Sequence, residues 1–296
     1  MLTTHKTKPR FVFFFDINGT VILGDNVRGK PLQVAARELL AEQRKHTFCD
    51  EQMTYKQFVD KQIPIPAGIS CEEEEFLKQA RLRDYSEYLP HVDLLYPELV
   101  EQVVEDADMI QNAITDMLSQ YRQVFDSFYN LVDACKVGEI SARIIFRSFG
   151  TDTEDVVKEV SRETNRTFTR YKFVGEHLTK TDSSEEPISK NNLLECLQNT
   201  AGGDAVWQDD YKHWKQHGFA SHSGKPFPLA KSTHASTCVV AVDTFLALTK
   251  PMYFVDQVNQ IIAQHPEDEL IHVFFDDNAH AKQIIHIIDH AQDANA

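Results

Sequence analysis

Short, largely apolar runs, each ending abruptly in polar residues, recur along this chain. They span Phe11 to Phe15, Ile140 to Phe146 and Leu270 to Phe275, and the β-branched run Cys238 to Val242 is a fourth. Apolar runs without alternation are typical of strands that are buried on both faces, as in parallel α/β sheets. The pattern therefore predicts a mainly parallel sheet.

Between the first two runs, the apolar positions follow the period of a helix instead. Their steps are mostly three or four residues, and Pro90 and Pro97 interrupt the pattern near its start. A capping box, Ser70 with Glu73, predicts the start of a helix upstream, and its acidic first turn is expected to be solvated. The expected interior of this helical bundle includes Tyr121, Phe125 and Phe128.

We therefore expect an α/β fold, with a helical module of residues 32–137 inserted into a core of residues 1–31 and 138–296. A second capping box, Thr151 with Glu154, predicts a helix after the second strand. Asp209, His213 and His217 share one face if their segment is helical, and the aromatic residues among them, Trp207 included, favour a packing helix over a zinc site. The histidines His280, His286 and His290 are expected around a final helix.

Composition excludes several classes of protein. The 296 residues carry a formal net charge of −15, which does not suit binding to nucleic acid or to an anionic membrane. No stretch approaches the roughly 18 apolar residues of a membrane span, and the first ten residues are polar. The five cysteines are scattered without C-x-x-C pairs, so a disulfide framework is not expected. We expect a cytoplasmic protein without nucleic-acid or membrane partners.

Polar residues at the strand ends are the candidate chemistry. The carboxyl ends of parallel strands meet at one edge of a sheet, where ligands bind, so Asp16, Ser148, Asp276 and Asp277 should lie together. Clustered carboxylates repel one another unless a cation compensates them, and oxygen ligands suit Mg²⁺. An aspartate at a strand end can also attack phosphorus.

Three segments resemble the motifs of the haloacid dehalogenase-like (HAD) superfamily. FVFFF followed by Asp16-Ile17-Asn18-Gly19-Thr20 resembles the first motif. Ile144 to Ser148 resembles the second, and IHVFFDDN, Ile271 to Asn278, resembles the fourth. The resemblance covers about a third of the chain and implies a Rossmann-like core with a cap inserted after the first strand.

The resemblance also implies roles for individual residues. Asp16 would be the nucleophile and a metal ligand, and Asn18 would contact the metal through its main-chain carbonyl. Asp277 would bind Mg²⁺, and Asp276 would support it. Ser148 would hold the phosphoryl group. The third-motif lysine would be Lys225, expected on a loop, or alternatively Lys231. The phosphate-binding set would comprise Thr20, Arg147, Ser148, Gly150 and Lys225.

Asn18 departs from the family pattern, in which an aspartate at this position protonates the leaving group and then activates water. A carboxamide has no proton to exchange, and general acid–base assistance is typically worth about 10²–10⁴-fold. The expected activity is Mg²⁺-dependent phosphoryl transfer, most simply by a phosphatase acting on a small phosphorylated compound. Three readings remain: a slow or specialised hydrolase whose acid–base group comes from elsewhere, a phosphotransferase with an activated leaving group, and a catalytically inactive module that binds a phosphorylated ligand or a protein.

Overall fold

The structure is a computed structural model of the 296-residue chain. It describes residues 10–24, 32–86, 88–148, 153–174, 177–181, 188, 203–210, 225–228, 235–277 and 285–288. The chain divides into two compact units. The first comprises Met1–Gly24, Arg122–Asp243 and Lys250–Ala296, and the second comprises Asp25–Tyr121 and Thr244–Thr249.

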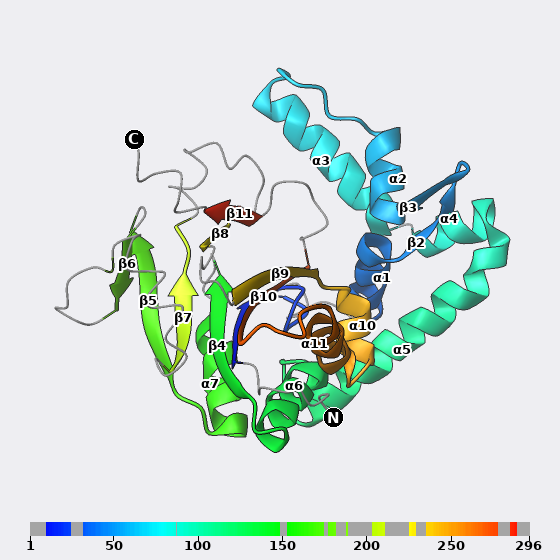
Figure 1. The fold of residues 1–296 in the computed structure, drawn as a ribbon. Coiled ribbons are helices and arrows are strands. Elements are labelled where there is room, and N and C mark those ends of the chain that lie inside the picture. The colour runs from blue at the N-terminus through cyan, green and yellow to red at the C-terminus, as the bar shows by residue number, and fades with distance from the viewer. Residues whose placement is uncertain are drawn as a thin grey trace. The chain divides into compact units, whose positions relative to one another are not determined.

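A seven-stranded sheet in the order β6-β5-β7-β4-β1-β10-β9 is the centre of the first unit (Figure 1). All neighbouring strands in it run parallel except β5 and β6. The strands are β1 (Arg10–Asp16), β4 (Ser141–Ser148), β5 (Phe168–Val174), β6 (His177–Lys180), β7 (Asp204–Gln208), β9 (Ala235–Ala241) and β10 (Leu270–Asp276). The four strands expected from the apolar runs are therefore confirmed, and the protein is an α/β protein with a mostly parallel sheet.

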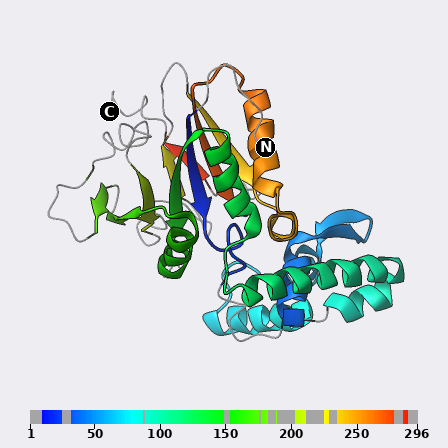
Figure 2. The same cartoon turned by 90° about the horizontal axis from the view of Figure 1, so that it is seen from below.

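The central strand β1 is apolar from Phe11 to Phe15 because both of its faces are buried. On one face, Phe15 stacks on Phe275 of β10 at 4.6 Å between ring centroids. The same ring meets Phe128 of helix α6 (Asp126–Val137) and Phe254 of helix α11 (Tyr253–Gln264) edge-on, at 5.1 and 5.4 Å. The two helices lie next to each other over this face (Figure 2).

On the opposite face of the sheet, Phe14 packs between Trp207 of β7 and Phe274 of β10, with ring centroids 5.6 and 6.2 Å away. Both partners belong to a cluster of buried apolar side chains that spans six strands of the sheet. A strand with large side chains on both faces cannot alternate polar and apolar residues, which explains the unbroken run.

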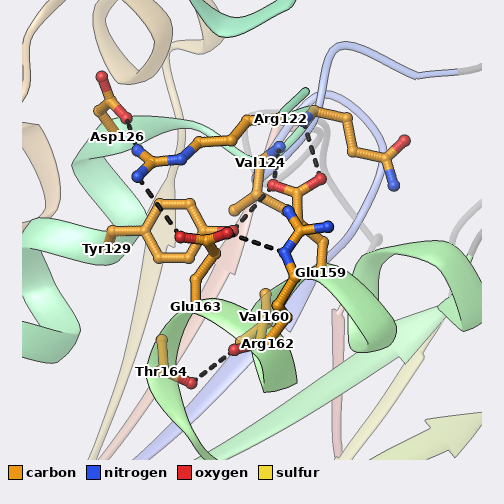
Figure 3. Close-up of polar contacts among 10 residues, drawn as sticks. Arg122, Val124, Asp126, Tyr129, Glu159, Val160, Arg162, Glu163 and Thr164 are labelled. Carbon is orange, nitrogen blue, oxygen red and sulfur yellow. Dashed lines mark hydrogen bonds and ion pairs between the residues drawn. The ribbon is translucent and has the colours of Figure 1, made fainter. Parts of the chain in front are cut away.

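A buried carboxylate fixes the segment at which the chain returns to the first unit (Figure 3). Glu159 of helix α7 (Thr153–Thr164) accepts hydrogen bonds from the backbone N–H groups of Gln123 and Val124, at 2.8 and 3.1 Å. It also accepts one from the hydroxyl of Tyr129, at 2.8 Å. Burial beside this carboxylate raises the pKa of Tyr129, so the phenol stays protonated and remains a donor.

The second unit is mainly helical. It contains helices α1 (Leu32–Gln43), α2 (Tyr55–Gln62), α3 (Cys71–Ser86), α4 (Tyr88–Leu95), α5 (Val100–Ser119) and α10 (Thr244–Thr249), a 3₁₀ turn (Pro97–Leu99), and the hairpin of β2 (Lys45–Phe48) and β3 (Glu51–Thr54). The predicted capping box of α3 is confirmed. The N–H of Glu73 donates to Oγ of Ser70 at 3.2 Å, and the N–H of Ser70 donates to the Glu73 carboxylate at 3.0 Å.

Helix α10 is distant in sequence from the rest of the second unit, yet it packs on α1 and α5. Its Phe245, Ala247 and Leu248 are buried, and the guanidinium carbon of Arg44 lies 4.7 Å from the ring centroid of Phe245. The helical unit is therefore built from two separate segments of the chain.

The helical pattern expected to run through Tyr121, Phe125 and Phe128 is interrupted. Helix α5 ends at Ser119 and α6 begins at Asp126, and Tyr121 between them is 89% exposed with a φ of +56°. The interior position expected for Tyr121 is wrong. Helix α6 packs on the sheet, so the first segment of the second unit ends at Tyr121, before the expected boundary at residue 137.

Two expected helices differ from the structure. Trp207 lies on strand β7 and is fully buried. Ile285–Ile288 form strand β11, which pairs in parallel with β8 (Lys225–Pro228) in a separate two-stranded sheet. Among the described helices, none has both the length and the apolar character that crossing a membrane requires.

Candidate functional site

Three carboxylates meet where the central strands end. Strands β1 and β10 pair in parallel, with Phe15 opposite Phe275, so their final residues, Asp16 and Asp276, lie at the same edge of the sheet. Carboxylate oxygens of Asp16, Asp276 and Asp277 all lie within 4.8 Å of one another. Asp276 is fully buried and Asp16 is 9% exposed. The structure thus brings together the three acidic residues that sequence reasoning placed at this edge.

The loop after β1 holds Asp277 in place. The backbone N–H of Asp277 donates a hydrogen bond to Oγ1 of Thr20, at 3.1 Å. Gly19 has a φ of +72°, and a Cβ on it would lie 2.4 Å from Oδ2 of Asp277. A glycine is therefore required twice here, for the left-handed backbone and for the close approach of the carboxylate.

Backbone hydrogen bonds make this loop a tight turn. The carbonyl of Ile17 accepts from the N–H groups of Val21 and Ile22 at 3.0 and 3.1 Å, and the N–H of Gly19 donates to the carbonyl of Ile22 at 2.8 Å. The side chain of Asn18 is exposed on the turn. The turn fixes the backbone around Asp16 and leaves Asn18 facing solvent.

The chemistry of the donor set suits a hard divalent cation. Three carboxylates close together repel one another strongly when little of their surface is in water, and a cation removes that repulsion. All the donors are oxygen atoms, which Mg²⁺ and Ca²⁺ prefer. Because Gly19 has no side chain, the carboxylate of Asp277 has room to lie close to the other two, as binding of one shared cation requires.

The neighbouring strand β4 brings Ser148 to the same edge. Its preceding residue, Arg147, is opposite Asp16 in the parallel register of β4 and β1. Ser148 is buried, and its carbonyl accepts a hydrogen bond from the N–H of Asp209 at 2.9 Å. A strand-end serine beside the acidic cluster is the arrangement that sequence reasoning expected.

The side chain of Arg147 has a different role from the predicted phosphate contact. Its guanidinium is fully buried and forms an ion pair with the carboxylate of Asp209, with Nε 3.1 Å from Oδ2. It also lies over the rings of Phe173, Trp207 and Phe274, at 5.6 to 5.8 Å from their centroids. These contacts place the charge within the apolar layer of the sheet, where it neutralises Asp209 and is closed to a phosphoryl group.

Sequence reasoning missed the role of Asp209. It placed this residue on a helix with His213 and His217, which lie outside the described residues. Asp209 instead follows strand β7, and its carboxylate is as buried as the guanidinium that it binds. The signal that could have located it is the buried charge of Arg147 itself, because a buried arginine needs an acidic partner.

The structure gives the backbone position of the predicted lysine but does not describe its side chain. Lys225 is the first residue of strand β8, opposite Ile285 of β11, and not on a loop as expected. The described part of the structure does not include its side chain, and Lys231, Gly150, His280 and His290 lie outside that part altogether. The phosphate-binding roles of Lys225 and Gly150 stay predictions.

Comparison of the chain with protein-family models, with curated proteins and with solved structures finds no match. The site is therefore characterised by its own residues alone. Its defining features are the three carboxylates, the glycine turn beneath them and the adjacent end of β4.

Proposed function

We propose that this chain is a Mg²⁺-dependent phosphoryl-transfer enzyme of the HAD-like type, a phosphatase for a small phosphorylated compound. The observation that carries the proposal is the cluster of Asp16, Asp276 and Asp277 within 4.8 Å at the ends of two central parallel strands. Edges of this kind are where α/β proteins bind ligands.

The proposed reaction begins at Asp16. One carboxylate oxygen attacks the phosphorus atom, a new P–O bond forms, and the bond to the leaving oxygen breaks, giving an aspartyl-phosphate. Mg²⁺, held by the three carboxylates, would offset most of their negative charge and polarise a phosphoryl oxygen. The hydroxyl of Ser148 donates to another phosphoryl oxygen, and the tight turn at Gly19 keeps Asp277 close to Asp16.

Asn18 sets the expected rate. Its exposed amide cannot donate a proton to the leaving group or take one from water. The first step then favours substrates whose leaving oxygen needs no proton, and hydrolysis of the aspartyl-phosphate is slow. The same residue favours the second candidate function, a module that binds a phosphorylated ligand without turning it over.

Hydrolysis of p-nitrophenyl phosphate, with and without Mg²⁺, tests the proposal. The natural chain is expected to show metal-dependent turnover, and Asp16→Asn to abolish it. Asn18→Asp is expected to raise turnover by up to about 10²–10⁴-fold, the usual value of a general acid–base group. Asp126→Asn is the matched control, because that aspartate pairs with Arg122 at the surface, and turnover should not change.

Two outcomes would overturn the enzyme hypothesis. One is turnover by Asp16→Asn equal to that of the natural chain. The other is no turnover by the natural chain together with activity in Asn18→Asp. In the second case, a rise in melting temperature on adding Mg²⁺ or phosphate would support the binding module.

A further inference from the structure

A cysteine, a histidine and an aspartate of the first unit form a hydrogen-bonded chain that the proposed phosphoryl transfer does not use. Sγ of Cys238, on strand β9, lies 3.4 Å from Nε2 of His265. Nδ1 of the same imidazole lies 3.1 Å from Oδ2 of Asp268. His265 ends helix α11, and Asp268 lies between that helix and strand β10.

The order of these contacts fixes the proton positions. An ionised carboxylate only accepts hydrogen bonds, so the Nδ1–H of His265 donates to Asp268. In the neutral imidazole, Nε2 is then the acceptor, and the S–H of Cys238 is its donor. This is the arrangement of a nucleophile, a base and an orienting carboxylate.

The ring of His265 lies between the end of a helix and a carboxylate. A cation is stabilised at the C-terminal end of a helix, and the backbone N–H of His265 donates to the carbonyl of Ile261 in the last turn of α11. The carboxylate of Asp268 stabilises the imidazolium from its other side. Burial and the nearby carboxylate of Asp268 raise the pKa of the Cys238 thiol, so a thiolate there needs the imidazolium of His265 as its counter-charge.

The neighbouring strand adds no charge. The register partner of Cys238 on β10 is Val273, which is buried and apolar. Within the described part of the chain, the charged or titratable groups facing the thiol are therefore His265 and Asp268. Cys238 is itself partly exposed, and the side chains of His265 and Asp268 are 30% and 27% exposed, so small molecules in solution can reach the group.

We propose that Cys238 is a reactive thiol that hydroperoxides oxidise, with His265 as its base and acid and Asp268 as the positioning residue. The thiolate sulfur attacks one oxygen of hydrogen peroxide, an S–O bond forms, and the O–O bond breaks. The departing hydroxide takes the proton from His265 and leaves as water. The cysteine becomes a sulfenic acid, oxidised by two electrons, and the peroxide is reduced.

The end of α11 argues for a hydroperoxide over an acyl substrate. Acyl transfer builds an oxyanion that needs backbone N–H donors, whereas the terminus beside Cys238 is the carbonyl end of a helix. Peroxide reduction needs only a thiolate and a proton donor for the leaving oxygen. The residues present supply both.

The test measures each cysteine separately in the full chain, with hydrogen peroxide, a sulfenic-acid trap and peptide mass spectrometry. Cys49 and Cys71, both exposed, serve as internal references. A free thiol is only about 3% ionised near pH 7, and a base beside it should increase the ionised fraction. A less basic thiolate reacts more slowly, which offsets part of that gain. The rate at Cys238 should therefore be about three- to tenfold higher with its partner His265 than without it. His265→Asn should remove that gain at Cys238 and leave the rate at Cys49 unchanged.

The pH profile separates this mechanism from simple exposure. The rate at Cys49 should rise with pH, whereas the rate at Cys238 should be nearly flat around neutral pH. Asp268→Asn should restore a rising profile at Cys238. The iodide that leaves iodoacetamide needs no proton. His265→Asn should therefore slow the alkylation of Cys238 by iodoacetamide less than it slows the oxidation of Cys238 by peroxide.

Melting temperatures of the variants confirm that they are folded. Equal rates at Cys238 in the natural chain and His265→Asn would overturn the proposal. A Cys238 profile parallel to that of Cys49 would overturn it too, because the thiol would then ionise without help from His265.

Discussion

Gly19 is the residue on which the acidic cluster depends most directly. Its left-handed backbone turns the chain under Asp277, and its missing side chain leaves room for the carboxylate. Sequence reasoning found Gly19 as part of a motif, and the structure adds the physical reason for it: a Cβ would lie 2.4 Å from Oδ2 of Asp277.

Gly19→Ala should therefore separate Asp277 from Asp16. Gly68→Ala is the control, because Gly68 also has a positive φ, +82°, but has nothing within 4 Å of a Cβ. The control should cost about 1 kcal/mol from backbone strain, and Gly19→Ala about 1–3 kcal/mol more from the clash. Urea unfolding measures both costs.

The same variant should lose the Mg²⁺-induced rise in melting temperature expected of the natural chain. Equal stability of the two glycine variants would mean that Asp277 moves aside without cost. Retention of the full Mg²⁺ effect by Gly19→Ala would mean that the cluster does not need this close approach.

The roles of some site residues could be predicted from the sequence, and those of others could not. Asp16 and Asp276 were predictable because a carboxylate that ends an apolar strand is visible in the sequence itself. The role of Arg147 was not, because its partner Asp209 lies 62 residues away and follows a strand that had not been recognised. A pair of buried charges is a property of two strands together, so neither strand alone reveals it.

At the scale of helices and strands, the length of an element decided whether it could be predicted from the sequence. The long apolar strands β1, β4 and β10 were found, whereas β7 has only five residues and contains polar ones. Its Trp207 also continued a plausible helical spacing into the following segment. Short strands acquire their identity from neighbours, and β7 lies between β5 and β4 in the sheet.

The break between α5 and α6 was hidden for a related reason. The apolar positions on both sides of it happen to keep the same period, so the pattern runs through Tyr121. What fixes the break is Glu159, whose carboxylate binds the N–H groups of Gln123 and Val124. The next N–H, of Phe125, donates to the carbonyl of Val21 in the turn after β1 at 2.9 Å.

Glu159→Gln should loosen this junction. The glutamine amide has one acceptor oxygen, and its NH₂ group faces N–H or O–H groups that are themselves donors. The free energy of unfolding should therefore fall by about 2–3 kcal/mol. Glu163→Gln, one turn further along α7, is the control. Its partners Arg162 and Arg122 lie 2.9 and 3.5 Å away near the surface, and the loss should be below about 1 kcal/mol.

Chemical denaturation measures the two losses, and hydrogen exchange at residues 123–125 locates them. A loss for Glu159→Gln no larger than that for Glu163→Gln would contradict the assignment. It would show that other contacts hold the segment.

At the scale of the whole molecule, the chain passes between its two units four times. Sequence reasoning predicted a helical insertion between two strands but not the contribution of residues 244–249. A six-residue helix has too few positions to show a period, and its partners α1 and α5 lie more than a hundred residues away in sequence.

Phe245→Ala in the full chain tests whether α10 stabilises the helical unit. Deleting a buried aromatic side chain should lower the stability of that unit by about 3–5 kcal/mol. Hydrogen-exchange mass spectrometry should then show faster exchange in α1 and α5, with β1 and β10 unchanged. Leu246→Ala, at a partly exposed position in the same helix, should have a smaller effect. Equal acceleration in β1 and β10 would show that the two units unfold as one.

The second segment of the helical unit also limits how such a protein can be recombined. A single crossover block carrying residues 25–121 into another α/β scaffold would leave behind the helix that covers Arg44 and packs on α1 and α5. The helical unit is therefore not one continuous segment of the chain. A stable hybrid has to take both residues 25–121 and residues 244–249 from the same protein.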